Sequence, residues 1–209
     1  MLICSMSNIR WNVLTRKAIL AFTLIAVPTC GLAEVCSTVG MSPYYIGEGN
    51  FARLEPAFED YVYMLDDACS AWGFTARDDC GIVTLMGDIG LNALATYCGD
   101  LPVIIYNREL SGIVGGDGAE FVIAHELGHH VCRHLDQTAD SLGTIRAEEL
   151  EADRFAGATL RKMNRKLEFI LDITSIFPED AGETHPSRPL RETAIRAGWI
   201  NPETALDCR

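Results

Sequence analysis

The stretch that decides the fold is Val122-Ile123-Ala124-His125-Glu126-Leu127-Gly128-His129-His130-Val131, an apolar run that contains the pattern His-Glu-x-x-His. A helix advances about 100° per residue, so residues four apart lie on one face, one turn along the axis. His125 and His129 are therefore expected to point the same way. Two imidazoles held in this way can bind one zinc ion.

Glu126 follows the first histidine and is placed to reach a water bound to that metal. Zinc lowers the pKa of its water, and a carboxylate can take the proton while the hydroxide attacks a carbonyl. The pattern thus predicts metal-assisted peptide hydrolysis, with Glu126 as general base and then general acid. The alternative is that both histidines merely lie on a helix surface or in a core.

A catalytic zinc needs a third protein ligand and an open fourth position. The stretch Ala147-Glu148-Glu149-Leu150-Glu151-Ala152-Asp153-Arg154-Phe155-Ala156 follows, with strong helix formers throughout. Glu149 and Asp153 are four apart and share a face. Glu149 can supply the third ligand, and Asp153 can accept a hydrogen bond from a ligand imidazole. Alone, this acidic cluster would more often be a solvated face. After His-Glu-x-x-His it favours a metal site.

The two motifs together resemble the gluzincin metallopeptidases, most closely the family of the CAAX prenyl protease and the heat-shock protease HtpX. In that family the first glutamate of Glu-x-x-Ala-Asp is the third zinc ligand, which corresponds to Glu149, and the aspartate corresponds to Asp153. The resemblance extends roughly from Gly90 to Trp199. It includes Asn92-Ala93-Leu94-Ala95 with the apolar run after it, and Thr184-His185-Pro186-Ser187 with Arg191 and Arg196. The gap between the motifs is short for the large membrane members, and no transmembrane helix is predicted, so a compact relative is expected.

Two further roles follow from the resemblance. In zinc peptidases of this shape an extended substrate pairs with the free edge of a strand beside the active cleft, through main-chain hydrogen bonds. We assign that edge, as a hypothesis, to Val103, Ile104, Ile105, Tyr106 and Asn107. His185 occupies the position of the family's His-Pro loop, so it is a candidate for stabilising the transition state or gating the zinc. A lone histidine is otherwise usually structural or exposed. His130 and His134 lack the spacing and are left out of the site.

Residues 1–33 are interpreted as a secretory signal, and residues 34–209 as the mature domain. Arg10, Arg16 and Lys17 form a basic start, 18–27 is apolar apart from Thr23, and Gly31-Leu32-Ala33 offers small residues before a cut. The apolar run is too short to span a membrane. We therefore expect export, most simply to a bacterial periplasm, without a transmembrane segment in the mature chain.

The charge and the cysteines agree with this interpretation. The chain carries 29 acidic against 17 basic residues, a net charge of −12, which disfavours binding to nucleic acid and leaves a protein or peptide as the expected substrate. Six cysteines remain after residue 33, and an even number in an exported chain favours disulfides. Of 15 possible connectivities, the sequence suggests only Cys69 with Cys80; the others are Cys36, Cys98, Cys132 and Cys208.

Periodicity places the remaining elements. Apolar residues at spacings of three and four predict a helix over 51–72, and 167–177 predicts another, broken by Pro178. The segments 82–86, 91–97 and 101–106 favour strands, with a turn at 98–100. The glycine-rich segment 111–118 is expected to be a mobile loop entering the metal helix. The helix with Glu149 should run to about Arg165, and Ser187 should cap a last helix.

The sequence therefore predicts one zincin-like α/β domain of the α+β class, in which two helices hold zinc beneath a small, mostly antiparallel sheet. The predicted function is that of a zinc-dependent endopeptidase outside the cytoplasm. The ImmA-type peptidases share an Ala-His-Glu-Leu-Gly-His helix but are typically cytoplasmic regulators, and the signal segment and Asp153 argue against them. A non-catalytic, zinc-stabilised envelope module is the other alternative, although a structural site has no need of Glu126.

Overall fold

The computed structural model describes residues 54–74, 80–98, 100–136, 139 and 141–208. The expected signal segment and Cys36 lie outside these residues. The described part is an α+β domain, as expected. Its elements follow in the order β1 (Glu55–Pro56), α1 (Glu59–Ala71), β2 (Val83–Met86), β3 (Ala93–Cys98), β4 (Leu101–Tyr106), α2 (Leu110–Val131), α3 (Leu142–Lys162), α4 (Leu167–Ile173), η1 (Thr174–Ile176), α5 (Arg188–Ile200) and η2 (Pro202–Leu206).

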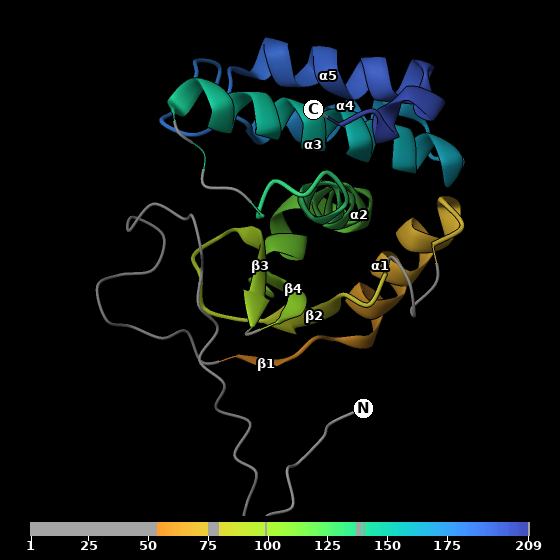
Figure 1. Ribbon diagram of the computed structural model, residues 1–209, viewed down its shortest axis with the longest axis vertical. Coiled ribbons are helices and arrows are strands. Elements are labelled where there is room, and N and C mark those ends of the chain that lie inside the picture. The colour runs from red at the N-terminus through yellow and green to blue at the C-terminus, as the bar shows by residue number, and fades with distance from the viewer. Residues whose placement is uncertain (1–53, 75–79, 99, 137–138, 140, 209) are drawn as a thin grey trace, which may run out of the picture. The chain divides into compact units, whose positions relative to one another are not determined.

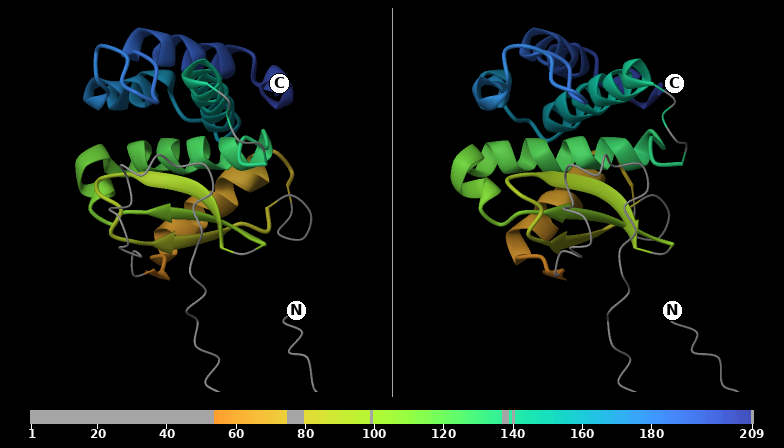
Figure 2. Two further views of the ribbon diagram at one scale, coloured as in Figure 1. Left: turned by 60° about the vertical axis from the view of Figure 1, so that its left-hand side comes forward. Right: turned by 90° about the vertical axis from the view of Figure 1, so that its left-hand side faces the viewer.

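Three layers organise the described residues (Figure 1). The sheet and α1 lie on one side of α2, and α3, α4 and α5 lie on the other (Figure 2). Ala124 and Leu127 of α2 have no exposed surface. Ala124 belongs to an apolar cluster with residues of α4 and α5, and Leu127 belongs to an apolar cluster with residues of α1 and the sheet. The apolar stretch that opened the sequence analysis is thus the central helix of the domain.

The sheet has the strand order β1-β2-β4-β3. Strand β4 pairs in parallel with β2 and antiparallel with β3, and β1 pairs antiparallel with β2, so the sheet is mostly antiparallel. The expected strands are therefore confirmed, and Cys98 of β3 pairs with Leu101 of β4.

The expected substrate-binding edge at Val103 to Asn107 is wrong. Residues 103–106 lie in β4, which pairs on both sides, and Val103, Ile104 and Tyr106 have no exposed surface. A continuous apolar run is typical of an interior strand covered on both faces. Asn107 lies beyond the strand, where its N–H donates to the carbonyl of Asn92 at 2.9 Å. Among the described strands, the outer one on this side is β3.

Helix α1 begins later than the periodicity predicts. Pro56 belongs to the two-residue strand β1, where it pairs with Leu85, and the helix starts at Glu59. Proline has a fixed φ and no N–H, so it fits the edge strand β1. The expected apolar face is otherwise present, because Tyr61, Leu65 and Ala68 are buried.

The expected mobile loop at 111–118 is also wrong, because these residues form the first turns of α2. The helix is kinked at Gly115, whose φ of 69° lies in the left-handed region that glycine adopts without strain. At Gly118 a side chain would crowd Val114 and Ile173. Gly115 therefore allows the kink, and Gly118 allows the close contact with Val114 and Ile173.

The C-terminal helices follow the expectations closely. Helix α3 ends at Lys162, and α4 continues into η1 and stops before Pro178. Ser187 precedes α5 as its N-cap residue, although its side chain makes no capping hydrogen bond. None of the helices in the described residues is long and apolar enough to cross a membrane.

Two disulfides lie within the described residues. The expected pair Cys69–Cys80 is present, and Cys132–Cys208 joins the end of α2 to the chain after η2. The second closes a loop of 76 residues that contains α3, α4 and α5, so it restrains the unfolded chain over most of the layer above α2.

Helices α3 and α5 cross at two glycines that allow backbone contact. A Cβ on Gly157 would overlap the carbonyl of Ile195, and a Cβ on Gly198 would overlap the carbonyl of Arg154. A backbone atom has no rotamer by which to move aside, so either side chain would push the helices apart.

Gly198→Ala is expected to lower the free energy of unfolding by about 2 kcal/mol or more, measured by urea denaturation, because overpacking outweighs the gain of about 1 kcal/mol in helix propensity. The matched control is Arg196→Ala, at an exposed position of the same helix, which should change stability by about 0.5 kcal/mol or less. A Gly198→Ala protein as stable as the wild type would contradict the close crossing.

Candidate metal centre

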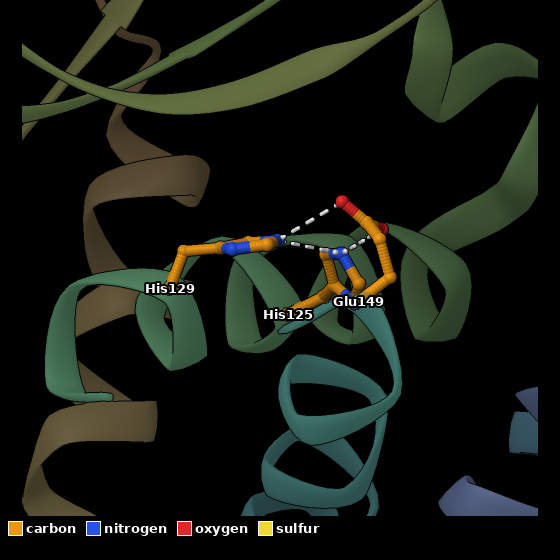
Figure 3. Close-up of side chains that lie close together, drawn as sticks. All are labelled: His125, His129 and Glu149. Carbon is orange, nitrogen blue, oxygen red and sulfur yellow. Dashed lines mark hydrogen bonds and ion pairs between the residues drawn. The ribbon is translucent and has the colours of Figure 1, made fainter. Parts of the chain in front are cut away.

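Two imidazoles of α2 face each other one helical turn apart. The Nε2 atoms of His125 and His129 lie 3.2 Å from one another (Figure 3). Gly128 lies between them, on the face that meets α3: a Cβ there would lie 3.1 Å from the Cα of Ala152 and 3.2 Å from the Cβ of Phe155. The glycine thus lets α3 approach the histidine pair closely.

Glu149 of α3 completes the group. Its Oε2 lies 3.3 Å from Nε2 of His125, and its Oε1 lies 3.5 Å from Nε2 of His129. Ligands bound at about 2.0 to 2.1 Å to a tetrahedral zinc lie about 3.3 Å from each other. The three residues, which could together hold a metal ion, already have nearly this spacing.

The carboxylate of Glu149 supplies a second observation that favours a cation. Its Oε2 is buried and lies 3.3 Å from Nε2 of both His125 and His185, without a hydrogen bond of good geometry. A buried carboxylate oxygen that is poorly satisfied is costly, and coordination to a cation would remove that cost. The residues present therefore fit a metal ion.

Asp153 holds His125 from behind. Its Oδ1 accepts a hydrogen bond from Nδ1 of His125 at 3.0 Å, and Arg191 of α5 donates to both carboxylate oxygens at 2.8 Å. Asp153 is fully buried, and Arg191 nearly so. With its proton held on Nδ1, His125 would offer the lone pair of Nε2 to a metal ion between His129 and Glu149.

Glu126 lies buried beside the group. Its Oε2 accepts a hydrogen bond from the backbone N–H of Ala95 at 2.7 Å, which connects α2 to the outer strand β3. Burial raises the pKa of Glu126 to about 7, with Glu149 adding to the rise and His125 opposing it. A carboxylate with a pKa near neutrality is suited to taking and returning a proton.

The charges of the site favour a cation between the histidines. Burial alone would lower the pKa of His125, but the hydrogen bonds and charges of Asp153 and Glu149 raise it to about 10. Burial lowers the pKa of His129 to about 3. Burial raises the pKa of Glu149, yet the two histidines outweigh this effect and hold it well below its usual range. The carboxylates therefore create a negative potential where the imidazoles converge.

His185 reaches the same carboxylate from the loop before α5. Its Nε2 lies 3.3 Å from Oε2 of Glu149, its Nδ1 lies 2.9 Å from Oγ1 of Thr184, and 39% of its side chain is exposed. The structure thus brings His185 to the solvent side of the predicted ligands. By contrast, Val103 to Tyr106 lie inside the sheet, and the strand that touches Glu126 is β3.

Sequence reasoning left out His134, which contacts a predicted ligand. Its Nδ1 lies 3.0 Å from Nδ1 of His129, and its Nε2 lies 3.2 Å from Oε2 of Glu151. Helical spacing does not reveal this contact because α2 ends at Val131, and Arg133, with φ of 60°, turns the chain back. His130 serves the fold instead, with Nε2 3.0 Å from the carbonyl of Val103 and its ring edge-on to Tyr97.

Arg191 is the other functional residue without a role in the sequence analysis. It is 38 residues from Asp153, and only the packing of α5 on α3 brings the two together. Its place about one turn into a helix after the His-Pro pair was the one available signal.

Comparison with known proteins gives one match. Residues 77–162 match a peptidase family, M78, described as the IrrE N-terminal-like domain. No curated protein and no solved structure matches the chain. The match supports similarity to a family of zinc metallopeptidase type, and it does not support the assignment to the family of the CAAX prenyl protease and HtpX. The matched segment contains His125, Glu126, His129, Glu149 and Asp153.

Proposed function

We propose that the chain is a zinc-dependent endopeptidase that hydrolyses peptide bonds of proteins outside the cytoplasm. The observation that carries the proposal is the convergence of His125, His129 and Glu149, with Glu126 buried next to His125 on α2. The matched peptidase family supports the same class of reaction.

Zinc is the proposed metal because two imidazoles and a carboxylate are the donor set of many catalytic zinc sites, which leave a fourth position open. When bound, zinc would polarise the scissile carbonyl and activate water for attack. His125, His129 and Glu149 would hold it. Asp153 would keep His125 in the tautomer that binds metal, and Arg191 would keep Asp153 in place.

Glu126 would move the proton. Its carboxylate accepts a proton from the attacking water and returns it to the nitrogen of the leaving amine, so that the carboxylate is regenerated. The hydrogen bond from Ala95 fixes its orientation. An extended substrate would add to β3, the outer strand beside Glu126, through main-chain hydrogen bonds.

His185 is proposed to act at the mouth of the site. Its Nε2 faces the carboxylate of Glu149, and its partial exposure leaves it accessible to a bound substrate. There it would donate to the oxyanion of the tetrahedral intermediate or control access to the metal.

Export is part of the proposal. The signal-like residues 1–33 and the disulfides Cys69–Cys80 and Cys132–Cys208 support an oxidising compartment, for which a bacterial periplasm is the simplest choice.

The family match favours one second candidate, an ImmA-type regulatory peptidase. Such an enzyme would use the same residues and the same chemistry. It would differ in substrate, cleaving a particular regulatory protein and leaving an unfolded general substrate such as casein intact.

The test is metal content and casein degradation measured on the same purified samples. The wild type should contain about one zinc per chain and degrade casein. Glu149→Ala should lose most of its zinc and its activity, because one of three protein ligands is gone. Glu168→Ala, at an exposed carboxylate of α4, is the matched control and should behave as the wild type.

The possible outcomes separate the candidates. Zinc without casein degradation would favour the regulatory peptidase or a non-catalytic zinc-stabilised module, and cleavage of co-purified or added protein partners would distinguish these two. A wild type without zinc would contradict the proposed site.

A further inference from the structure

His134 and Glu151 form a chain of contacts that ends on a predicted metal ligand. The distance from Nδ1 of His129 to Nδ1 of His134 is 3.0 Å, and that from Nε2 of His134 to Oε2 of Glu151 is 3.2 Å. The side chains of His134 and Glu151 are only 5% and 13% exposed. Because they are largely excluded from water, these polar atoms need hydrogen-bond partners within the protein.

We infer that His134 and Glu151 are positioning residues that hold the His129 ring in the tautomer that binds metal. The inference rests on the proposed zinc site. His134 contacts the Nδ1 side of His129, which faces away from His125 and Glu149, and neither His134 nor Glu151 belongs to the proposed ligands.

The positions of the protons follow from the geometry. His129 turns Nε2 toward His125 and Glu149, so metal binding requires the lone pair on Nε2 and leaves the ring proton on Nδ1. Only one proton fits between the facing Nδ1 atoms, so Nδ1 of His134 must accept it. The ring proton of His134 then lies on Nε2, where the carboxylate of Glu151 accepts it.

The result is one directed series of hydrogen bonds, from His129 to His134 to Glu151. It parallels the contact from His125 to Asp153, with one imidazole inserted between ligand and carboxylate. The hydrogen bonds that start at each ligand histidine thus lead to a carboxylate of α3, which makes both rings better electron-pair donors to a metal.

A second metal site is the competing interpretation of the same residues. Cys132, His134 and Glu151 also place ligand-type atoms within 4.8 Å of one another. The sulfur of Cys132 is bonded to Cys208, however, so it is not available as a thiolate ligand. The series of hydrogen bonds therefore remains the better account.

The test is the tautomeric state of the histidines in the zinc-loaded protein, from long-range ¹H–¹⁵N correlation spectra. We expect the proton of His129 on Nδ1 and that of His134 on Nε2. A His134 ring protonated on Nδ1 would overturn the inference, as would a second bound zinc per chain. This measurement needs no substitution and does not depend on hydrolysis.

Zinc affinity, measured by competition with a chelator, gives an independent readout. His134→Phe keeps a ring but removes the acceptor, and we expect zinc to bind about 10- to 100-fold more weakly. His134→Asn offers an amide oxygen near the place of Nδ1 and should recover most of the affinity. Glu151→Gln should weaken binding less than His134→Phe, since its amide oxygen still accepts. Wild-type affinity in His134→Phe would overturn the inference.

His130→Gln is the matched control. Its amide can replace the hydrogen bond to the carbonyl of Val103, and the side chain of His130 contacts Val103 and Tyr97, so zinc affinity should be unchanged. A wild type without any zinc would contradict the proposed function and this inference together. A zinc-loaded wild type with the opposite tautomers would contradict the inference alone.

Discussion

The Glu126→Gln protein is expected to keep its zinc and to lose peptide hydrolysis, with kcat/KM reduced by about 10²- to 10⁴-fold. The amide has the shape of the carboxylate, and its oxygen can still accept the hydrogen bond from Ala95. It has no basic site for the proton of the attacking water. The loss should therefore fall on the chemical step, with metal content and folding unchanged.

The measurement is hydrolysis of a fluorogenic peptide that the wild type cleaves, with zinc determined on the same samples. The comparison with Glu149→Ala separates two causes, because that variant should lose zinc and activity together. Retained hydrolysis in a zinc-verified Glu126→Gln protein would exclude Glu126 as the general base and would move the search to another group of the site, with His185 first.

Arg191→Ala is expected to lower the free energy of unfolding by about 3 to 5 kcal/mol, because it removes the guanidinium partner of the fully buried Asp153 carboxylate. Burial raises the pKa of Asp153, but its bonds to Arg191 and His125 outweigh burial and hold it below the ordinary value. The stability from this carboxylate is thus present at neutral pH and is lost as the pH falls through its lowered pKa. Zinc affinity should fall as well, by about 10- to 100-fold, since Asp153 orients His125.

A double variant separates the two effects. Asp153→Asn combined with Arg191→Met carries no buried charge at this point, so we expect much of the stability to return, as measured by urea denaturation. Zinc affinity should stay low because an amide is a weaker acceptor for His125 than a carboxylate. Arg196→Ala, on the exposed face of α5, is again the control. If Arg191→Ala is as stable as the wild type, the buried pair with Asp153 is not a stabilising element.

The core of the site was predictable because its spacing is local. Four residues along a helix place two side chains on one face whatever the rest of the chain does, so His125 with His129 and Glu149 with Asp153 could be paired from sequence. The structure brings both pairs together at the contact around Gly128. The closer family resemblance is not supported by the comparison, which matches residues 77–162 to a different peptidase family.

The two wrong predictions, the substrate-binding edge and the mobile loop, concern contacts between elements that are distant in the sequence. The strand Leu101–Tyr106 was recognised, but its place inside the sheet depends on β2, which lies earlier in the sequence. The glycines at 111–118 suggested a loop, although the segment is helical with one kink at Gly115, and Gly118 lies close to Ile173. Local propensity does not report such contacts.

By itself, the sequence determined the α+β class, the helical pairing of the predicted ligands and Glu126, and the disulfide Cys69–Cys80, since each rests on periodicity or on short separations along the chain. Only the tertiary structure decided that Arg191 donates hydrogen bonds to Asp153 and that β3 is the strand beside Glu126. It also decided that His134 contacts both His129 and Glu151. Those contacts form where helix ends, turns and strand order bring distant residues together, and they are set by the packing of the whole domain.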